Sequence, residues 1–325
     1  MIDSKQLEAL AAVITEQSFD KAARALFLTQ SAVSQRIRQL EERIGRMLVV
    51  RSSPIRPTLA GMALLRHYRQ LAMLEQDLFE EIGPGESRGV EIVKLAVNAD
   101  SLDTWFLRGV RGILTEGGVL LELVVDDQSV THAYLRSGEV QGAITSTPAN
   151  FQGLVTHDLG DMEYLCVATP HFRDRHCRHG FDRKAAKHAP MVIFSRKDAL
   201  QHEFLQQRFG EAINPPVHVM PSNISFQGLI LEGIAYGMVS RILVETHLQR
   251  GELIDLAPGE TLRVPHFYQC WSLQSGPSRR MAEAVVATAK TCLTARTLPR
   301  GRSTPTAAEP DRFPRPGTAP RHSRE

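Results

Sequence analysis

The sequence contains few cysteines and no long apolar run, and each of these two features excludes a class of protein. Four cysteines occur among 325 residues, without the paired spacing of a zinc site or a disulfide framework. No apolar run approaches the ~18 residues of a membrane span. The first residues lack a basic segment followed by an apolar one, so we expect no export signal. These features predict a cytoplasmic protein.

Patterns typical of catalytic and cofactor sites are also missing. The sequence contains no P-loop, no Gly-x-Gly-x-x-Gly and no Gly-x-Ser-x-Gly pattern. A group of histidines and a cysteine occurs at residues 171–179, but its spacing is irregular and the arginines between them would repel a cation. We therefore expect a polar surface loop there. The sequence predicts no enzyme activity, no cofactor and no metal site.

Charge is distributed unevenly along the chain. The net charge is +2, yet residues 296–325 hold seven arginines against three acidic residues, so the first 295 residues carry −2. The same segment holds six prolines and cannot bury a core, which predicts a disordered basic tail. The tail could add nonspecific affinity for DNA phosphates or have no role.

Residues 18–41 predict two short helices joined by a tight turn. Thr29 is placed to cap the second helix and Gly45 to end it. One face of this helix is apolar and the other is polar and basic. Such a helix can enter the major groove, where Gln and Arg read base edges and Ser contacts phosphate, although an ordinary amphipathic helix is the alternative. The apolar face is Val33, Ile37, Leu40 and Ile44, and the polar face is Ser31, Ser34, Gln35 and Arg38.

A short strand and a proline-containing turn follow the second helix. Residues 47–51 predict the strand, and Pro54 and Pro57 suit a turn at an edge. This arrangement predicts a wing that carries Arg51 and Arg56 to the DNA backbone or minor groove. Residues 1–60 hold nine Lys/Arg against six Asp/Glu, a balance that suits a DNA-binding module.

These residues together resemble the N-terminal signature of LysR-type transcriptional regulators. The resemblance implies a winged helix-turn-helix, mostly α-helical, then a dimerising linker helix and a two-lobed α/β effector domain similar to periplasmic binding proteins. It also implies that Gln30 contacts DNA together with the polar face of the helix and Arg51. The matching residues are Ala22, Ala23, Leu26, residues 29–34, Ile37, Leu40, Glu41, Gly45, Leu48, Arg51, Pro57, Thr58 and Gly61.

The remaining chain can be divided to fit this layout. Residues 1–58 would form the DNA-binding domain, and residues 59–89 a linker helix of about 25 residues, roughly 37 Å long, with a Gly/Pro hinge. So long an apolar helix needs a partner surface, such as a second copy in a dimer. Alternating strand and helix patterns over residues 90–295 predict parallel α/β sheets. Lobe I would comprise about 90–162 and 268–295, and lobe II about 163–267.

An effector site is expected where strands end and helices begin. The first such place runs from Asn98 to Trp105, where Ser101 and the free amides behind it could hold a carboxylate and Asp100 or Asp103 could hold a cation. Trp105 could cover an alkyl chain or stack on a guanidinium. Helix capping is the alternative role for these acidic and hydroxyl residues. The ends of the next strands add Asp126, Asp127, Thr145 and Ser146.

The stretch from Asn98 to Trp105 and the segments 136–143, 204–207 and 251–256 resemble the ArgP/LysG group of this family. The resemblance covers residues 1–295 and implies a sensor of lysine or arginine that controls a gene for a basic-amino-acid exporter. Its partners would be double-stranded promoter DNA, the effector, further copies in a dimer or tetramer, and RNA polymerase, with no membrane contact. The alternatives are a LysR-type regulator with a different effector and an architectural DNA-binding protein that has no effector.

Overall fold

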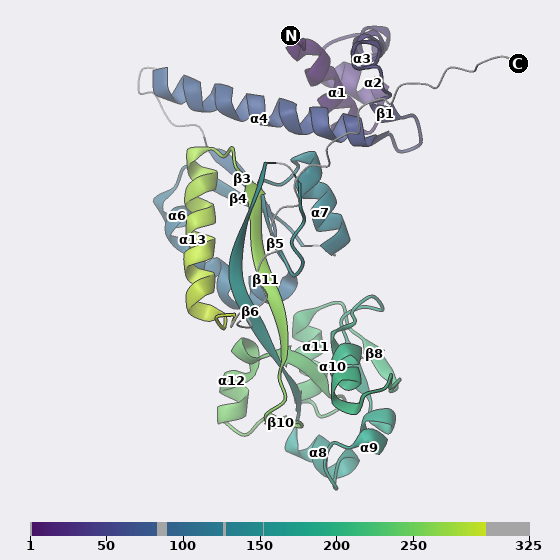
Figure 1. Cartoon of the computed structure of the whole chain (residues 1–325), viewed down its shortest axis with the longest axis vertical. Coiled ribbons are helices and arrows are strands. Elements are labelled where there is room, and N and C mark those ends of the chain that lie inside the picture. The colour runs from purple at the N-terminus through teal and green to yellow at the C-terminus, as the bar shows by residue number, and fades with distance from the viewer. Residues whose placement is uncertain (1, 83–89, 126–127, 152, 297–325) are drawn as a thin grey trace, which may run out of the picture. The chain divides into compact units, whose positions relative to one another are not determined.

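The computed structural model describes residues 2–82, 90–125, 128–151 and 153–296 (Figure 1). The predicted hinge at 83–89, Asp126, Asp127 and the predicted tail from residue 297 onward lie outside these ranges. Among the helices within them, none is long and apolar enough to cross a membrane.

Three helices form the N-terminal bundle, and each begins at a polar cap. They are α1 (Ser4–Glu16), α2 (Phe19–Ala25) and α3 (Gln30–Ile44). The side chains of Asp3, Ser18 and Thr29 accept hydrogen bonds from the first turns of these helices. Helix α3 packs against α1 and α2, and its predicted apolar face, buried except for the half-buried Ile44, forms a separate core with Leu7, Leu10 and Val13. Burial of this face orients the polar face of α3 outward.

A small hairpin and a long helix follow the bundle. Strands β1 (Val49–Val50) and β2 (Arg56–Pro57) pair antiparallel, with Val50 opposite Arg56. The observed first strand is shorter than the predicted 47–51. Helix α4 (Leu59–Ile82) follows as predicted. Its Gly61 packs against the backbone that precedes β1, because a Cβ built on Gly61 would lie 2.0 Å from the carbonyl oxygen of Leu48.

One seven-stranded sheet runs through the effector region in the order β10-β6-β11-β5-β3-β4, with β9 also paired to β6. A two-stranded sheet, β7-β8, accompanies it. The longest strands, β6 and β11, lie side by side over ten paired positions, from Leu154 opposite Trp271 to Tyr164 opposite Leu262 (Figure 1). The strands are β3 (Glu91–Ala96), β4 (Val119–Val124), β5 (Gly142–Thr145), β6 (Leu154–Ala168), β7 (Met191–Ile193), β8 (Val217–Val219), β9 (Gly237–Ser240), β10 (Ile254–Asp255) and β11 (Leu262–Trp271).

The expectation of parallel sheets is correct for some strands and wrong for others. Strand β3 pairs parallel with β4 and β5, and β7 pairs parallel with β8. Strands β9, β10 and β11 all pair antiparallel with β6. For β11 the reason is that the chain leaves the first lobe through β6 and returns through β11, so these two crossing strands must run in opposite directions. We call residues 90–162 and 268–295 lobe I, and residues 163–267 lobe II.

Helices cover the strands of both lobes. In lobe I, α13 packs against α6 and contacts β3, β6 and β11. The helix predicted from residue 101 begins earlier and contains a π-helical turn at Leu102–Phe106. In lobe II, α8 occupies much of the segment predicted as a polar loop. The helices are α5 (Ala99–Ser101), α6 (Leu107–Glu116), α7 (Gln128–Ser137), α8 (Pro170–His176), α9 (Arg183–His188), α10 (Leu200–Phe209), α11 (Asn223–Leu231), α12 (Arg241–Gln249) and α13 (Gly276–Cys292).

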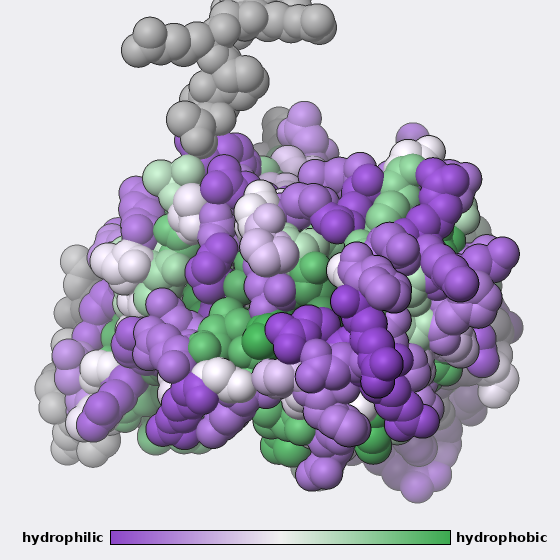
Figure 2. All heavy atoms as spheres, turned by 90° about the horizontal axis from the view of Figure 1, so that it is seen from below, coloured by the Kyte–Doolittle hydropathy of each residue, from purple (hydrophilic) through white to green (hydrophobic). Residues whose placement is uncertain are grey.

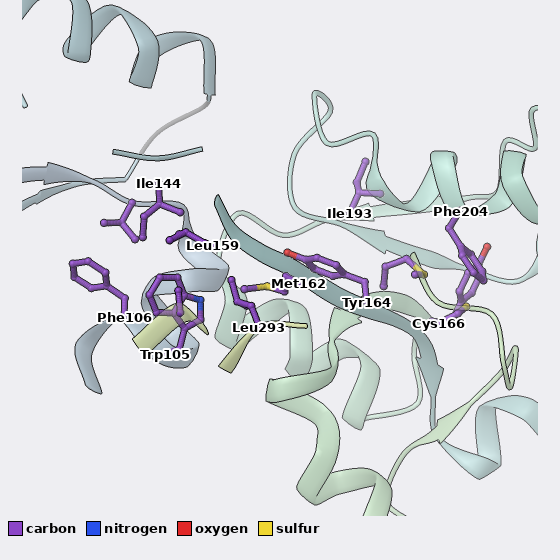
Figure 3. Close-up of a cluster of buried hydrophobic side chains, with 14 of the residues drawn as sticks. Trp105, Phe106, Ile144, Leu159, Met162, Tyr164, Cys166, Ile193, Phe204 and Leu293 are labelled. Atoms are coloured by element: carbon purple, nitrogen blue, oxygen red, sulfur yellow. The ribbon is translucent and has the colours of Figure 1, made fainter. Parts of the chain in front are cut away.

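The main hydrophobic core is continuous between the lobes. Figure 3 shows Trp105, Phe106 and Leu159 at one end, Met162 and Tyr164 along β6, and Phe204 at the other end. A register shift between His266 and Phe267 places Leu159 as an extra residue of β6 in this core. On the face shown in Figure 2, hydrophilic side chains predominate around smaller hydrophobic areas.

The close approach at Gly61 yields a stability prediction. Gly61→Ala would force a methyl group against the backbone oxygen of Leu48, so we expect it to lower the free energy of unfolding by about 1–3 kcal/mol. Urea unfolding followed by circular dichroism measures this loss. Gly112→Ala in α6 is the control, since its Cβ meets no atom within 4 Å, and it should stabilise the protein by about 0.5–1 kcal/mol. Equal effects of the two substitutions would contradict the prediction.

Candidate functional site

The outward face of α3 combines exposed polar groups with a helix N-terminus. Gln30, Ser31, Gln35 and Arg38 are exposed, and Ser34 is half-buried. The Thr29 hydroxyl accepts from the backbone N–H of Ala32 and lies 3.0 Å from the Ser31 hydroxyl. Amides at a helix N-terminus favour a phosphate, while Gln and Arg side chains of this length reach base edges. The face therefore has the chemistry of a DNA-reading surface.

The hairpin that follows α3 is fixed to it through a buried carboxylate. Glu41, near the end of α3, accepts a 2.8 Å hydrogen bond from the backbone N–H of Leu48. The hairpin then presents Arg51 and Arg56, both exposed. The Arg51 guanidinium lies 5.5 Å from the centroid of the Phe19 ring, which helps to orient it. Both predicted wing arginines thus lie on one short hairpin next to α3.

A second site is a cavity of about 910 Å³ between the two lobes. Lobe I contributes the turn at the start of α5, including Asn98 and Asp100, and lobe II contributes most of the remaining wall. This volume suits a small molecule rather than a macromolecule. The principal polar residues in the wall are Asn98, Asp100, Tyr164, Ser195, Arg196, Lys197, Asp198, Gln201, Asn223, Gln227 and Ser240.

Asp100 is the carboxylate of the cavity wall that is hydrogen-bonded to Tyr164. The phenol of Tyr164 donates a 2.5 Å hydrogen bond to one of its oxygens. Burial is the main cause that raises the pKa of Asp100, and the carboxylates of Asp198 and Asp103 raise it further, against the hydrogen bond from Tyr164. A ligand cation beside this carboxylate would offset the cost of its burial.

Tyr164 contributes only as a hydrogen-bond donor to this pair. Burial and the adjacent Asp100 carboxylate raise the pKa of Tyr164 well above its ordinary range, so its hydroxyl stays protonated. Tyr164 lies on β6 immediately after the crossing from lobe I, and its ring belongs to the continuous core (Figure 3). The fold therefore holds the donor rigidly, and the donor in turn positions Asp100.

Three wall residues carry buried oxygens without a partner among the residues that the structure describes. They are Asn98 Oδ1, Gln201 Oε1 and Ser240 Oγ. Gln201 is 2% exposed and Ser240 is 1% exposed. Buried polar groups are usually satisfied by protein, water or ligand, so these atoms can make hydrogen bonds to a bound molecule. The hydroxyl of Ser240 can donate to a carboxylate or accept from an ammonium group.

The basic residues of the wall differ from Asp100 in their environment. Arg196 and Lys197 are exposed, and solvent screens their charges. The neighbouring Asp198 is held by the backbone, because its carboxylate accepts from the N–H groups of Phe194 and Leu200. The least hydrated charge at the cavity is thus negative, although two positive side chains lie at its wall.

The structure brings together only part of the predicted effector residues. Asn98 and Asp100 line the cavity, whereas Ser101 and Trp105 are fully buried and do not line it. Trp105 packs in the lobe I core, 6.4 Å from the Phe106 ring centroid. Thr145 is buried and donates to Gln269, and neither it nor Ser146 lines the cavity. Asp127 lies outside the described residues.

Sequence reasoning missed the wall residues of lobe II, among them Tyr164, Gln201, Asn223 and Ser240. Tyr164 and Ser240 lie in predicted strands, but nothing in a strand pattern identifies which position faces a cavity. Asn223 had a usable signal, since Ser222 caps the helix that it begins. The histidine group of residues 171–179 forms no cluster of three metal-binding side chains within the described ranges.

The raised pKa of Asp100 predicts how the stability of the protein depends on pH. Between the ordinary aspartate pKa of about 4 and the raised pKa of Asp100, the folded protein binds more protons than the unfolded chain. The free energy of unfolding therefore falls as the pH rises through this window, and it stays lower at any pH above the raised pKa. Asp100→Asn removes this loss and keeps an oxygen acceptor for Tyr164. We expect this variant to be the more stable one at neutral pH in urea unfolding.

Asp174→Asn, an exposed change on α8, serves as the control and should not alter the pH profile in this way. A parent protein that gains stability relative to Asp100→Asn as pH rises from about 4 to about 8 would contradict the assignment.

Comparison with known proteins assigns both regions of the chain to one family. Residues 4–62 match the bacterial regulatory helix-turn-helix protein, lysR family, and residues 115–291 match the LysR substrate binding domain. The transcriptional regulator ArgP of Photobacterium profundum is 38% identical over 293 residues, which cover 90% of this chain and 98% of that protein.

Two solved structures are similar over most of their length. The crystal structure of ArgP from Mycobacterium tuberculosis has a TM-score of 0.84 and 38% identity, and the match covers 91% of this chain and all of that one. Full-length LysG from Corynebacterium glutamicum, with bound effector Arg, has a TM-score of 0.77 and 32% identity, over 88% of this chain and 98% of that one. The chain therefore belongs to the LysR family of transcriptional regulators, with ArgP and LysG proteins among its relatives.

Proposed function

We propose that this DNA-binding regulator senses a basic amino acid, L-lysine or L-arginine, in the cavity between its lobes. The observation that carries the proposal is the Asp100 carboxylate, which is half-buried at the cavity wall and bound by a neutral donor, Tyr164. A cationic side chain next to it would form a charge-assisted hydrogen bond. The bound arginine of the LysG structure supports the same class of effector.

The remaining wall can accommodate the amino-acid end of such a ligand. Ser240 Oγ and Gln201 Oε1 have no protein partner within the described chain, and both residues line the cavity from lobe II. Ser240 also precedes α12, whose first amides favour a carboxylate. We assign the side-chain cation to Asp100 in lobe I and the α-carboxylate to the Ser240 region in lobe II.

An anionic effector is the second candidate, because Arg196 and Lys197 lie at the same wall. Both side chains are exposed to solvent, where a unit charge contributes less binding energy than in a buried setting. An anion would also approach Asp100, whose carboxylate already experiences repulsion from Asp103 and Asp198. The basic effector is therefore favoured.

The regulated gene and the assembly are part of the proposal. The resemblance of the sequence to the ArgP/LysG group implies control of a gene for a basic-amino-acid exporter, and we propose such a gene as the target. Helix α4 carries Leu71, Leu74 and Leu78 at helical spacing, each more than one-third exposed, and a second copy of α4 would cover them in a dimer. A tetramer and contact with RNA polymerase remain further predictions.

Isothermal titration tests the effector class. We expect saturable binding of L-lysine or L-arginine and none of L-leucine or L-glutamate. Asp100→Asn should weaken binding at least about 10-fold, because a hydrogen bond to a charged group contributes about 1.5–3 kcal/mol. Asp174→Asn should bind like the parent protein. If the folded protein binds neither basic amino acid, the effector class is wrong, while the DNA-binding family assignment stands.

DNA titration tests the reading face of α3. Gln35→Ala should weaken binding to a specific promoter site by about 5- to 150-fold, with little change for unrelated DNA, because a base-edge contact contributes about 1–3 kcal/mol of discrimination. Gln207→Ala on α10, also exposed, should leave both affinities unchanged. Equal weakening on specific and unrelated DNA would show that Gln35 contacts the backbone rather than a base.

A further inference from the structure

Asn223 occupies the space next to two carboxylates of the other lobe. Its side-chain amide donates a 2.5 Å hydrogen bond to Asp103 Oδ2 and a longer one, at 3.5 Å, to Asp100 Oδ1. Asn223 is the first residue of α11 in lobe II, whereas both aspartates lie on the turn around α5 in lobe I. One neutral amide group therefore connects the lobes across the cavity.

The remaining contacts of the aspartates define what this amide does. The second oxygen of Asp100 is bound by Tyr164, so Asp100 Oδ1 faces Asn223 and the cavity. Asp103 is exposed, and the amide of Asn223 is its side-chain partner across the lobes. The two hydrogens of a primary amide can serve both carboxylates, as the terminal nitrogen of a guanidinium or an ammonium group would.

We propose that Asn223 is an internal competitor for the side-chain cation of the effector, and that the effector must displace its amide from Asp100 and Asp103. The inference rests on the proposed function, because it places the cation of a basic amino acid at this carboxylate pair. A cationic donor adds the attraction of opposite charges to its hydrogen bonds with the carboxylates, whereas the neutral amide of Asn223 supplies the hydrogen bonds alone, so displacement is favourable.

The displacement couples occupancy of the cavity to the arrangement of the lobes. The amide hydrogen bonds are a direct polar link between α11 and the α5 turn, and binding of the cation removes this link. A ligand shifts the equilibrium between two arrangements of the lobes only if it binds one of them more tightly than the other. The arrangement with the Asn223 link and the arrangement without it differ in this way, because the link occupies the carboxylates that the cation would bind. Asn223 thereby sets both the effector affinity and the response to it.

The test is isothermal titration of the full chain with L-arginine and L-lysine. Asn223→Ala removes the competitor, and we expect the affinity for the basic amino acid to rise about 10-fold, the scale of one hydrogen bond to a charged group. Asn223→Asp removes the donor, adds a third carboxylate and should raise the affinity further. Ile224→Ala changes the neighbouring side chain, which is 87% exposed, and should have no effect.

The outcomes separate this inference from the proposed function. If the parent protein binds arginine or lysine and Asn223→Ala binds it more weakly or equally, Asn223 is a ligand contact or a bystander and the inference is wrong. Tighter binding by Asn223→Ala supports it, even where the parent binds too weakly to measure. If the parent and both Asn223 variants bind neither amino acid, the proposed function fails, and the competitor role fails with it.

A measurement without ligand tests the link itself. Asn223→Ala and Asp103→Ala should each lower the free energy of unfolding in urea, and the double variant should lose less than the two single losses together, because both remove the same hydrogen bond. Strictly additive losses would show that the amide and the carboxylate do not interact in solution, which would overturn the inference independently of any effector.

Discussion

The antiparallel pairing of β6 with β11 is the constraint on which the effector region depends. These strands are the long connections between the lobes, and they share one hydrogen-bonded ladder from Leu154 opposite Trp271 to Tyr164 opposite Leu262. The hydrophobic core follows β6 from one lobe into the other, so the crossing is packed as well as paired (Figure 3). The position of Tyr164 on this ladder explains why the cavity has a fixed hydrogen-bond donor where the two lobes meet.

We infer that the choice of effector depends on one carboxylate, Asp100, which lies next to the rigid donor Tyr164. Asp100 is kept next to Tyr164, and burial makes its ionised form costly. A cation from solvent or a donor from the opposite lobe can reduce this cost, and in the structure Asn223 supplies the donor. The N-terminal bundle has its own hydrophobic core and its own buried hydrogen bond, from the backbone N–H of Leu48 to Glu41. The local geometry of the polar face of α3 therefore does not depend on the cavity.

The two regions differ in how far the sequence predicted them. The recognition helix was predicted together with its cap, Thr29, because helical periodicity and capping are local signals. The effector cavity was predicted only at Asn98 and Asp100, which follow a strand directly in the chain. Trp105 was expected at the ligand and packs in the core, since periodicity does not distinguish a core face from a cavity wall. Tyr164 and Asn223 reach Asp100 from 64 and 123 residues away, a proximity that depends on how the strands cross between the lobes.

We propose that the cavity recognises the positive charge of its ligand, and not the ligand's shape, through Asp100. L-citrulline is close to L-arginine in size and shape, but its side chain ends in a neutral group. The most direct measurement is therefore the affinity of the folded protein for L-arginine and L-citrulline, side by side at neutral pH. We expect saturable binding of arginine and at least about 10-fold weaker binding of citrulline. Equal affinity for the two would contradict it, because the Asp100 carboxylate would then have no role in selecting the effector.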